Sequence, residues 1–184
     1  MRNSPISPEG PVYETLSFIL RLVKMDDARS LLTCYADKRA VLKMNADHCT
    51  SDFYFTTIQE MESCIASGLK EYHEHKYMRL AVLPKGQKGA VGTVEIFSGE
   101  SGILRIDIAT KYDKERYIEE LIRVAVHDFI RDFQIGNLKI KVSNTPERIP
   151  LLKKYGFVPS PSFYPEGGYY EKAGIKSTSF QAVE

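Results

Sequence analysis

A strand followed directly by a long amphipathic helix is the feature that most restricts the fold of this chain. Residues 103–108 form an apolar-rich run typical of a strand. A short polar turn at 110–113 follows, and one apolar stripe then repeats at intervals of three and four residues as far as Phe133. The stripe consists of Ile118, Leu121, Ile122, Ala125, Val126, Phe129, Ile130 and Phe133. Such a helix has to bury its stripe, and a sheet beside it predicts an α/β protein.

The remaining patterns predict a mixed, mostly antiparallel sheet flanked by helices. Further strands are expected at Phe18–Val23, Met78–Leu83, Ala90–Phe97 and Leu138–Val142, with one or two more between Val158 and Ala173. Further helices are expected from Met25, from Thr57 and from Pro146, whereas 38–54 has no clear period. The strands at 103–108 and 138–142 flank the long helix, so they should run parallel or splay apart.

The chain reads as one domain without an internal repeat or a linker. Its 184 residues suffice for a single core, which we place at 13–173. Residues 1–12 are rich in Pro, Ser and Asn and predict a flexible N-terminal arm. Residues 174–184 predict a flexible tail.

Charge and cysteine content favour a cytoplasmic protein without a nucleic-acid or membrane partner. The net charge of +1 gives no electrostatic reason to bind nucleic acid or an anionic membrane. The N-terminus has no apolar signal region, and no apolar run is long enough to span a bilayer. The three cysteines show no metal-ligand spacing and are expected to be reduced, with no metal site.

The turn between the strand and the long helix allows two interpretations. The first turn of a helix offers free N–H groups and a positive dipole end, which favour a bound phosphate. Alternatively, Thr110 or Asp113 simply caps a helix whose exposed face is charged.

Three segments resemble the GNAT-fold N-acetyltransferases, and in particular the ribosomal-protein-alanine acetyltransferase branch. The opening Glu14-Thr15-Leu16-Ser17-Phe18-Ile19-Leu20-Arg21 with Asp27-Ala28 is similar to that branch's "ET-x-R-L-x-L-R … DA". Gly92-Thr93-Val94-Glu95-Ile96-Phe97 looks like its third strand. Asn144, followed by the run from Ile149 to Phe157, is similar to its "N-x-x-S-x-x-L-x-x-K-x-G-F" segment. Together with the element order, the resemblance covers roughly residues 13–172.

The resemblance implies transfer of an acetyl group from acetyl-CoA to a primary amine, either a protein N-terminus or a small amine. The pantetheine would hydrogen-bond along Ile106–Ile108, and Asn144 would line the thioester end. The phosphates would lie on the loop formed by Asp113, Lys114, Glu115, Arg116, Tyr117 and Ile118. The acceptor stays open between a small molecule and a peptide, and the oligomeric state stays open too, a homodimer included.

The phosphate loop departs from the family pattern, which keeps a second hypothesis open. Family members carry glycines there, whereas the chain has Asp113, Arg116 and Ile118 at the matching positions. Lys111, Lys114 and Arg116 would then have to bind the phosphates through their charges. The alternative is a non-catalytic GNAT-like binding or interaction module, and a third hypothesis is a scaffold for another anion. The tyrosine that many relatives use as an acid is replaced by Leu152.

Two charges in the central strand give candidates for the general base. Arg105 and Asp107 lie on the face opposite Leu104, Ile106 and Ile108, where a core strand would normally be apolar. Asp107 would take the proton of the acceptor amine, or else form a structural pair with Arg105. Glu95 on the neighbouring strand is the second candidate, with a solvent-facing role as the alternative.

Overall fold

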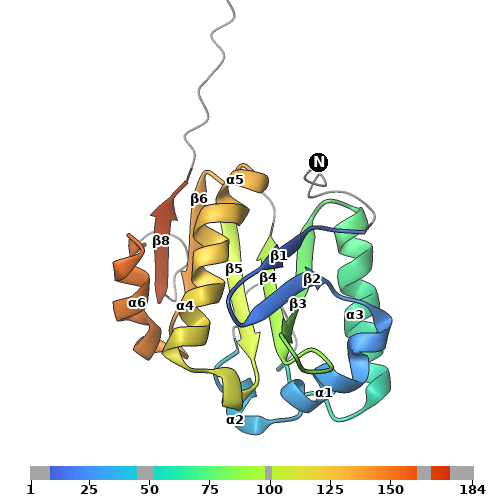
Figure 1. The fold of residues 1–184 in the computed structure, drawn as a ribbon. Coiled ribbons are helices and arrows are strands. Elements are labelled where there is room, and N and C mark those ends of the chain that lie inside the picture. The colour runs from blue at the N-terminus through green and yellow to red at the C-terminus, as the bar shows by residue number, and fades with distance from the viewer. Residues whose placement is uncertain (1–8, 45–51, 98–100, 161–166, 175–184) are drawn as a thin grey trace, which may run out of the picture.

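An eight-stranded sheet organises the protein, whose computed structural model describes residues 9–44, 52–97, 101–160 and 167–174 (Figure 1). The strand order is β1-β2-β3-β4-β5-β6-β8-β7, and only the β5–β6 pair is parallel among the described strands. The strands are β1 (Val12–Glu14), β2 (Phe18–Leu22), β3 (Tyr77–Pro84), β4 (Gly92–Phe97), β5 (Ser101–Ile108), β6 (Asn137–Lys141), β7 (Val158–Pro159) and β8 (Tyr169–Ala173). The predicted α/β class and mixed, mostly antiparallel sheet are thus confirmed.

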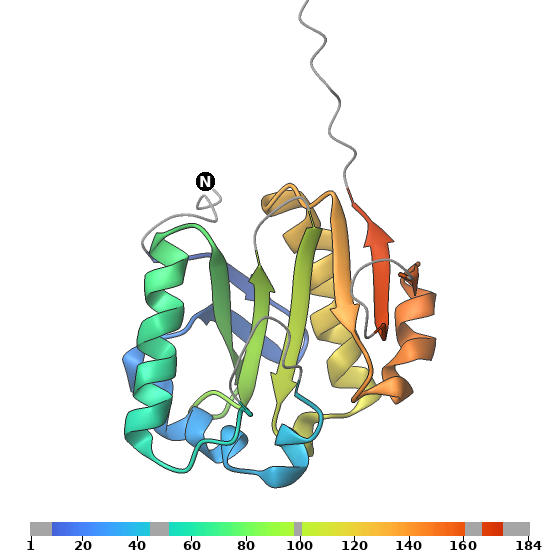
Figure 2. The same ribbon diagram turned by 180° about the vertical axis from the view of Figure 1, so that it is seen from behind.

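Helices cover both faces of the sheet (Figures 1 and 2). One face holds the long helix α4 (Glu115–Val124), which continues through the π-helical turn η3 (Ala125–Phe129) into α5 (Ile130–Asp132), with η4 (Pro146–Arg148) and α6 (Ile149–Lys154) beside it. The other face holds α1 (Ala28–Tyr35), α2 (Lys38–Val41) and α3 (Ile58–His73). The short 3-10 turns η1 (Met25–Asp27) and η2 (Thr110–Tyr112) precede α1 and α4.

Apolar and charged side chains alternate along β5 and point to opposite faces of the sheet, as the sequence predicts. Leu104, Ile106 and Ile108 are buried in the same apolar cluster as the stripe of α4. Arg105 and Asp107 are also buried, but they point toward the side of α1 and α3. The second apolar cluster, between α1, α3 and the sheet, therefore borders two charged side chains.

The pairing of the parallel strands β5 and β6 stops partway along β5, where β6 ends. Their register runs from Ser101–Asn137 to Leu104–Ile140 and stops there, although β5 continues to Ile108. The second half of β5 therefore has no β6 residue beside it. This gap between the strands opens toward the first turn of α4.

Several boundaries differ from the sequence-based expectations. The predicted arm is shorter, because Pro11 is buried and Val12 begins β1, which pairs with β2. The unassigned stretch 38–54 contains the short helix α2, and its residues 45–51 lie outside the described residues. Residues 1–8 of the arm and 175–184 of the tail also lie outside them. No helix within the described part of the chain is long and apolar enough to span a bilayer.

Candidate active site

In the gap, the carbonyl group of Ile106 in β5 has no hydrogen-bond donor from a neighbouring strand. The Ile106 carbonyl oxygen instead accepts a hydrogen bond from Nη1 of Arg148, at 3.3 Å. Ile106 and Ile108 direct their polar backbone groups to the same side, because every second residue of a strand does so. The segment Ile106–Ile108 thus has the geometry to pair with an extended chain laid into the gap.

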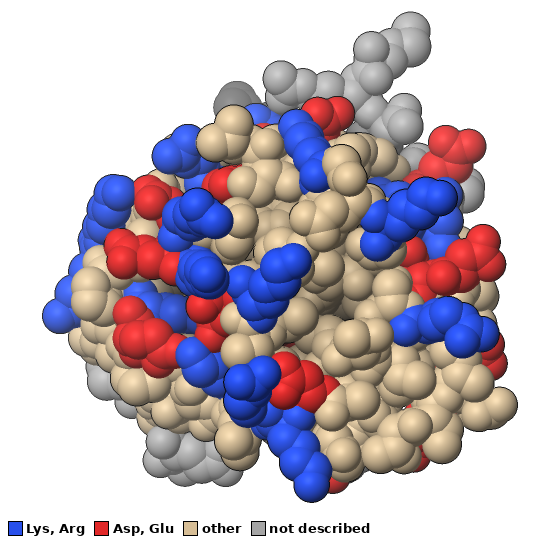
Figure 3. All heavy atoms as spheres, turned by 60° about the horizontal axis from the view of Figure 1, so that its bottom comes forward, with Lys and Arg blue, Asp and Glu red and all other residues tan. Residues whose placement is uncertain are grey.

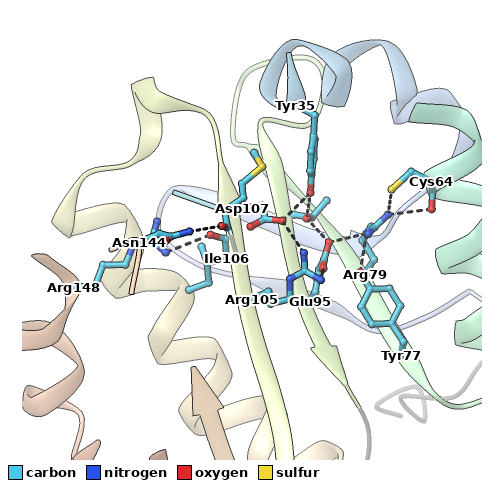
Figure 4. Close-up of polar contacts among 12 residues, drawn as sticks. Tyr35, Cys64, Tyr77, Arg79, Glu95, Arg105, Ile106, Asp107, Asn144 and Arg148 are labelled. Carbon is cyan, nitrogen blue, oxygen red and sulfur yellow. Dashed lines mark hydrogen bonds and ion pairs between the residues drawn. The ribbon is translucent and has the colours of Figure 1, made fainter. Parts of the chain in front are cut away.

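An ion cluster lies at the mouth of the gap, beside the first turn of α4 (Figure 4 shows Arg148 there). Asp113 accepts from Nη2 of Arg148 at 3.1 Å and from Lys43, which also binds Glu147 at 2.6 Å. Burial opposes ionisation of Asp113, but its bonds to Lys43 and Arg148 outweigh this and lower the pKa of the carboxyl. Arg148 is 6% exposed, and its Nε has no hydrogen-bond partner within the described structure.

The first turn of α4 can offer a phosphate two backbone N–H groups, fewer than a glycine-rich loop would offer. The carbonyl of Lys114, the N-cap, accepts from the N–H groups of Tyr117 and Ile118, and the Lys114 N–H donates to Tyr112. Glu115 and Arg116 occupy the first two helical positions, whose N–H groups have no acceptor inside a helix.

The cations beside this turn differ from those predicted from the sequence. The Arg116 guanidinium lies over the Tyr117 ring at 4.4 Å, and the Lys111 ammonium lies 5.3 Å from the Tyr112 ring. Lys43 and Arg148, which come from distant parts of the chain, bind Asp113 instead. Figure 3 shows Lys and Arg side chains, interspersed with acidic ones, around a hollow on this face of the molecule.

Asn144 lies on the loop after β6, at the same end of the gap. Its side-chain amide donates to the Met44 carbonyl at 3.1 Å, which ties the end of α2 to this loop. Asn144 is exposed and Met44 is buried. The Asn144 amide is thus bonded to the chain in the free protein, and its predicted place at the thioester end stays a prediction.

Four charged residues form a buried cluster on the opposite face of the sheet (Figure 4). Nε of Arg79 donates to Oε1 of Glu95 at 2.7 Å, and Nη1 of Arg105 lies 3.4 Å from Oε2 of Glu95. Nη2 of Arg105 is 3.7 Å from Oδ2 of Asp107. Glu95 is fully buried, so the solvent-facing alternative for it was wrong. Two cations and two carboxylates balance one another in this cluster.

The two carboxylates of the cluster have very different proton affinities. Burial raises the pKa of Asp107 to about 6, and the nearby Glu95 charge adds to the rise. Burial acts on Glu95 in the same direction, but Arg79 and Arg105 outweigh it and hold the pKa of Glu95 well below its ordinary value. Glu95 is therefore a fixed anion, whereas Asp107 can exchange a proton near neutral pH.

Tyr35 connects Asp107 to the helix layer. Its hydroxyl donates to Oδ2 of Asp107 at 3.2 Å and lies 2.8 Å from the hydroxyl of Thr93. Oδ1 of Asp107 has no hydrogen-bond partner in the described structure. One carboxylate oxygen is thus held in place, while the other is buried without a hydrogen-bond partner in the described structure.

A groove between α3 and the sheet leads to this cluster. It has a volume of about 580 Å³, with Arg79, Arg105 and Tyr77 on the sheet side and Cys64, Ser67 and Gly68 on α3. Neither Tyr35 nor Arg79 was selected from the sequence, because a tyrosine among eleven and an arginine in a strand give no local signal.

Comparisons with solved structures identify the fold. RimL, a ribosomal L7/L12 alpha-N-protein acetyltransferase in complex with coenzyme A, matches with a TM-score of 0.70 and 8% identity over 88% of this chain and 97% of that one. RimJ from Mycobacterium smegmatis in complex with CoA-disulfide matches with 0.68 and 14%, over 90% and 86%. Ribosomal-protein-S5-alanine acetyltransferase from Vibrio fischeri matches with 0.65 and 13%, over 90% and 97%.

Sequence comparisons add nothing to this, since no family model and no curated protein matches the chain. The structural matches extend over nearly the whole of each chain. The predicted architecture is confirmed: the chain has the GNAT fold of the ribosomal-protein acetyltransferases.

Proposed function

We propose that the protein transfers an acetyl group from acetyl-CoA to a primary amine in the cytoplasm. The observation that carries this proposal is the gap between β5 and β6, where Ile106–Ile108 faces an opening that ends at the first turn of α4. The pantetheine amides would pair with this segment, as a further strand would. The solved structures of the same fold that contain coenzyme A or acetyl-CoA support the choice of cosubstrate.

In this proposal Arg148 and Lys43 bind the phosphates of coenzyme A, as a glycine-rich loop does in other members of the fold. Both side chains bind the Asp113 carboxylate next to the two unbonded N–H groups of α4. A pyrophosphate bound there would offer Arg148 a dianionic partner, and the Ile106 carbonyl would then be released for the pantetheine. Asp113 repels the phosphates, and the two cations offset that repulsion.

Asp107 acts as the base. The acceptor arrives as an ammonium ion, its proton passes to Asp107 directly or through a water molecule, and the free amine attacks the thioester carbonyl. The new C–N bond forms as the C–S bond breaks, and the sulfur leaves with the electron pair and takes up a proton. The thioester is already activated, so positioning supplies much of the rate and no tyrosine acid at Leu152 is required.

One observation favours the alternative, a non-catalytic binding module. Arg148 occupies the gap in the free protein, and the N–H groups of Lys114, Tyr117 and Ile118 bond to backbone carbonyls. A module of this kind would keep Arg148 in place whatever the concentration of acetyl-CoA.

Calorimetric titration with acetyl-CoA distinguishes the acetyltransferase from the non-catalytic binding module. We expect micromolar binding to the full chain and a roughly 10- to 100-fold loss in Arg148→Ala, because a charge-assisted hydrogen bond contributes about 1.5–3 kcal/mol. The variant also frees the Ile106 carbonyl, but a neutral hydrogen bond of about 1 kcal/mol is the smaller effect. Arg148→Lys keeps the charge and should lose less.

Arg131→Ala is the matched control, since Arg131 is a surface arginine on α5 that pairs with Asp128 and Asp132. It should bind acetyl-CoA like the parent protein. Absence of binding at millimolar acetyl-CoA in a folded parent protein would refute the transferase proposal and favour the module.

A further inference from the structure

The groove along α3 ends on a guanidinium with unused hydrogen-bonding capacity. Arg105 is 3% exposed, and its Nε and Nη2 have no hydrogen-bond partner in the described structure. Nη1 is directed at Glu95, and the separation from Nη2 to Asp107 is 3.7 Å, too long for a hydrogen bond. A buried donor without a partner costs free energy, so two of them on one side chain call for an explanation.

The two unused donors form one edge of the guanidinium. The Nε and Nη2 hydrogens of an arginine point the same way and match the two oxygens of a carboxylate. Arg79 differs, because its Nε donates to Glu95 and Tyr77 and its Nη1 to the sulfur and the carbonyl of Cys64. Of the two arginines in the groove, Arg105 is therefore the one whose Nε–Nη2 edge has no hydrogen-bond partner in the described structure, and that edge is buried in the free protein.

We propose that this groove selects an acceptor amine that also carries a carboxylate, which binds the Nε–Nη2 edge of Arg105. The inference rests on the proposed function, because Asp107 then lies beside the amine. Nη2 of Arg105 and Oδ2 of Asp107 are only 3.7 Å apart, so the amine and the carboxylate of the ligand should be joined by a short chain. An ω-amino acid and a peptide N-terminus followed by an acidic residue both have this chemistry.

The mouth of the groove limits the charge of the ligand. Glu60 and Glu71 also line it, on the exposed side of α3. Glu60 is held by the threonines at the start of the helix, where it accepts from the N–H groups of Thr56 and Thr57. These two carboxylates disfavour a second negative charge on the ligand, so a single carboxylate close to the amine is the preferred pattern.

Binding in the groove can be measured without acetyl transfer by alkylation of Cys64. The sulfur lies 2.7 Å from Nη1 of Arg79 on the groove wall. We expect 5-aminopentanoate to slow the reaction of Cys64 with iodoacetamide several-fold, followed on the Cys64 peptide by mass spectrometry. Pentylamine has the same chain and amine without the carboxylate and should not protect.

Two variants of different kinds test the site. Arg105→Lys keeps the charge but loses the two-donor edge, and should lose protection by 5-aminopentanoate. Ser67→Phe places a ring in the groove from an exposed position on α3 and should also abolish it, even if Arg105→Lys does not fold. Ala66→Phe puts the same ring on an exposed position that does not line the groove, and protection should persist.

Acceptor assays then distinguish the two sources of the ligand. With acetyl-CoA, 5-aminopentanoate should be acetylated at least ten times faster than pentylamine, or the peptide Ser-Glu-Ala-Ala faster than Ser-Gln-Ala-Ala. Equal protection by 5-aminopentanoate and pentylamine, or none by either, would overturn the groove proposal. If 5-aminopentanoate protects Cys64 while acetyl-CoA does not bind, the groove proposal stands and the transferase proposal falls.

Discussion

Replacing Asp107 by Asn should change how the stability of the protein depends on pH. Asn resembles the protonated carboxyl, so the variant lacks the titration of this one group. In the parent protein the pKa of Asp107 is raised from 3.8 to about 6, because burial and Glu95 disfavour the charge. The folded state therefore binds more protons than the unfolded state between these values, and its stability falls as the pH rises from about 4 to 6. A shift of about 2 units corresponds to roughly 3 kcal/mol.

The difference in unfolding free energy between Asp107→Asn and the parent isolates this effect, since all other titrations cancel. Urea unfolding at intervals from pH 4.5 to 7.5 should show the variant gaining on the parent by about 2 kcal/mol, since roughly 1 kcal/mol of the effect occurs below pH 4.5, with a plateau above pH 7. The same variant should lose most of its acetyl transfer, since its amide is not a base. A difference that does not vary with pH would refute the buried, proton-exchanging carboxylate.

Three further predictions concern residues around the buried cluster. Tyr35→Phe removes the hydroxyl that donates to Asp107 and lowers its pKa, so the acetylation rate should reach its plateau at higher pH; an unchanged pH–rate profile would contradict this. Gly92→Ala should cost about 3 kcal/mol or more in urea unfolding, because a Cβ there would overlap the Asp107 carbonyl oxygen. Gly68→Ala, whose Cβ would meet only ordinary contacts at 3.5 Å, should instead stabilise α3 by up to about 1 kcal/mol.

Local periodicity was sufficient to predict most of the fold. The stripe of the long helix, the alternation along β5 and the Thr57–Glu60 capping box are short-range patterns, and each has the expected counterpart in the structure. The parallel pairing of β5 with β6 also followed from the sequence, because a crossover through the long helix joins these two strands.

The ion pairs of the site could not be predicted in the same way. Lys43 and Asp113 are 70 residues apart, and Arg79 and Glu95 meet only because β3 and β4 pair in one register. Lys43 belongs to a stretch without a clear period, so nothing in the sequence placed it beside α4. The cations nearest in sequence, such as Arg116, turn instead to the aromatic rings next to them. Long-range pairing, rather than composition, decides which charges surround the gap.

The central claim, that acetyl-CoA lies along Ile106–Ile108, is tested most directly by residue-resolved amide hydrogen exchange. Spectra of the full chain would be compared with and without saturating acetyl-CoA. We expect slower exchange at Ile106 and Ile108 and at Glu115 and Arg116, because pantetheine and phosphate oxygens would accept from these N–H groups. Unchanged exchange at all four, or protection confined to another face of the molecule, would contradict the claim.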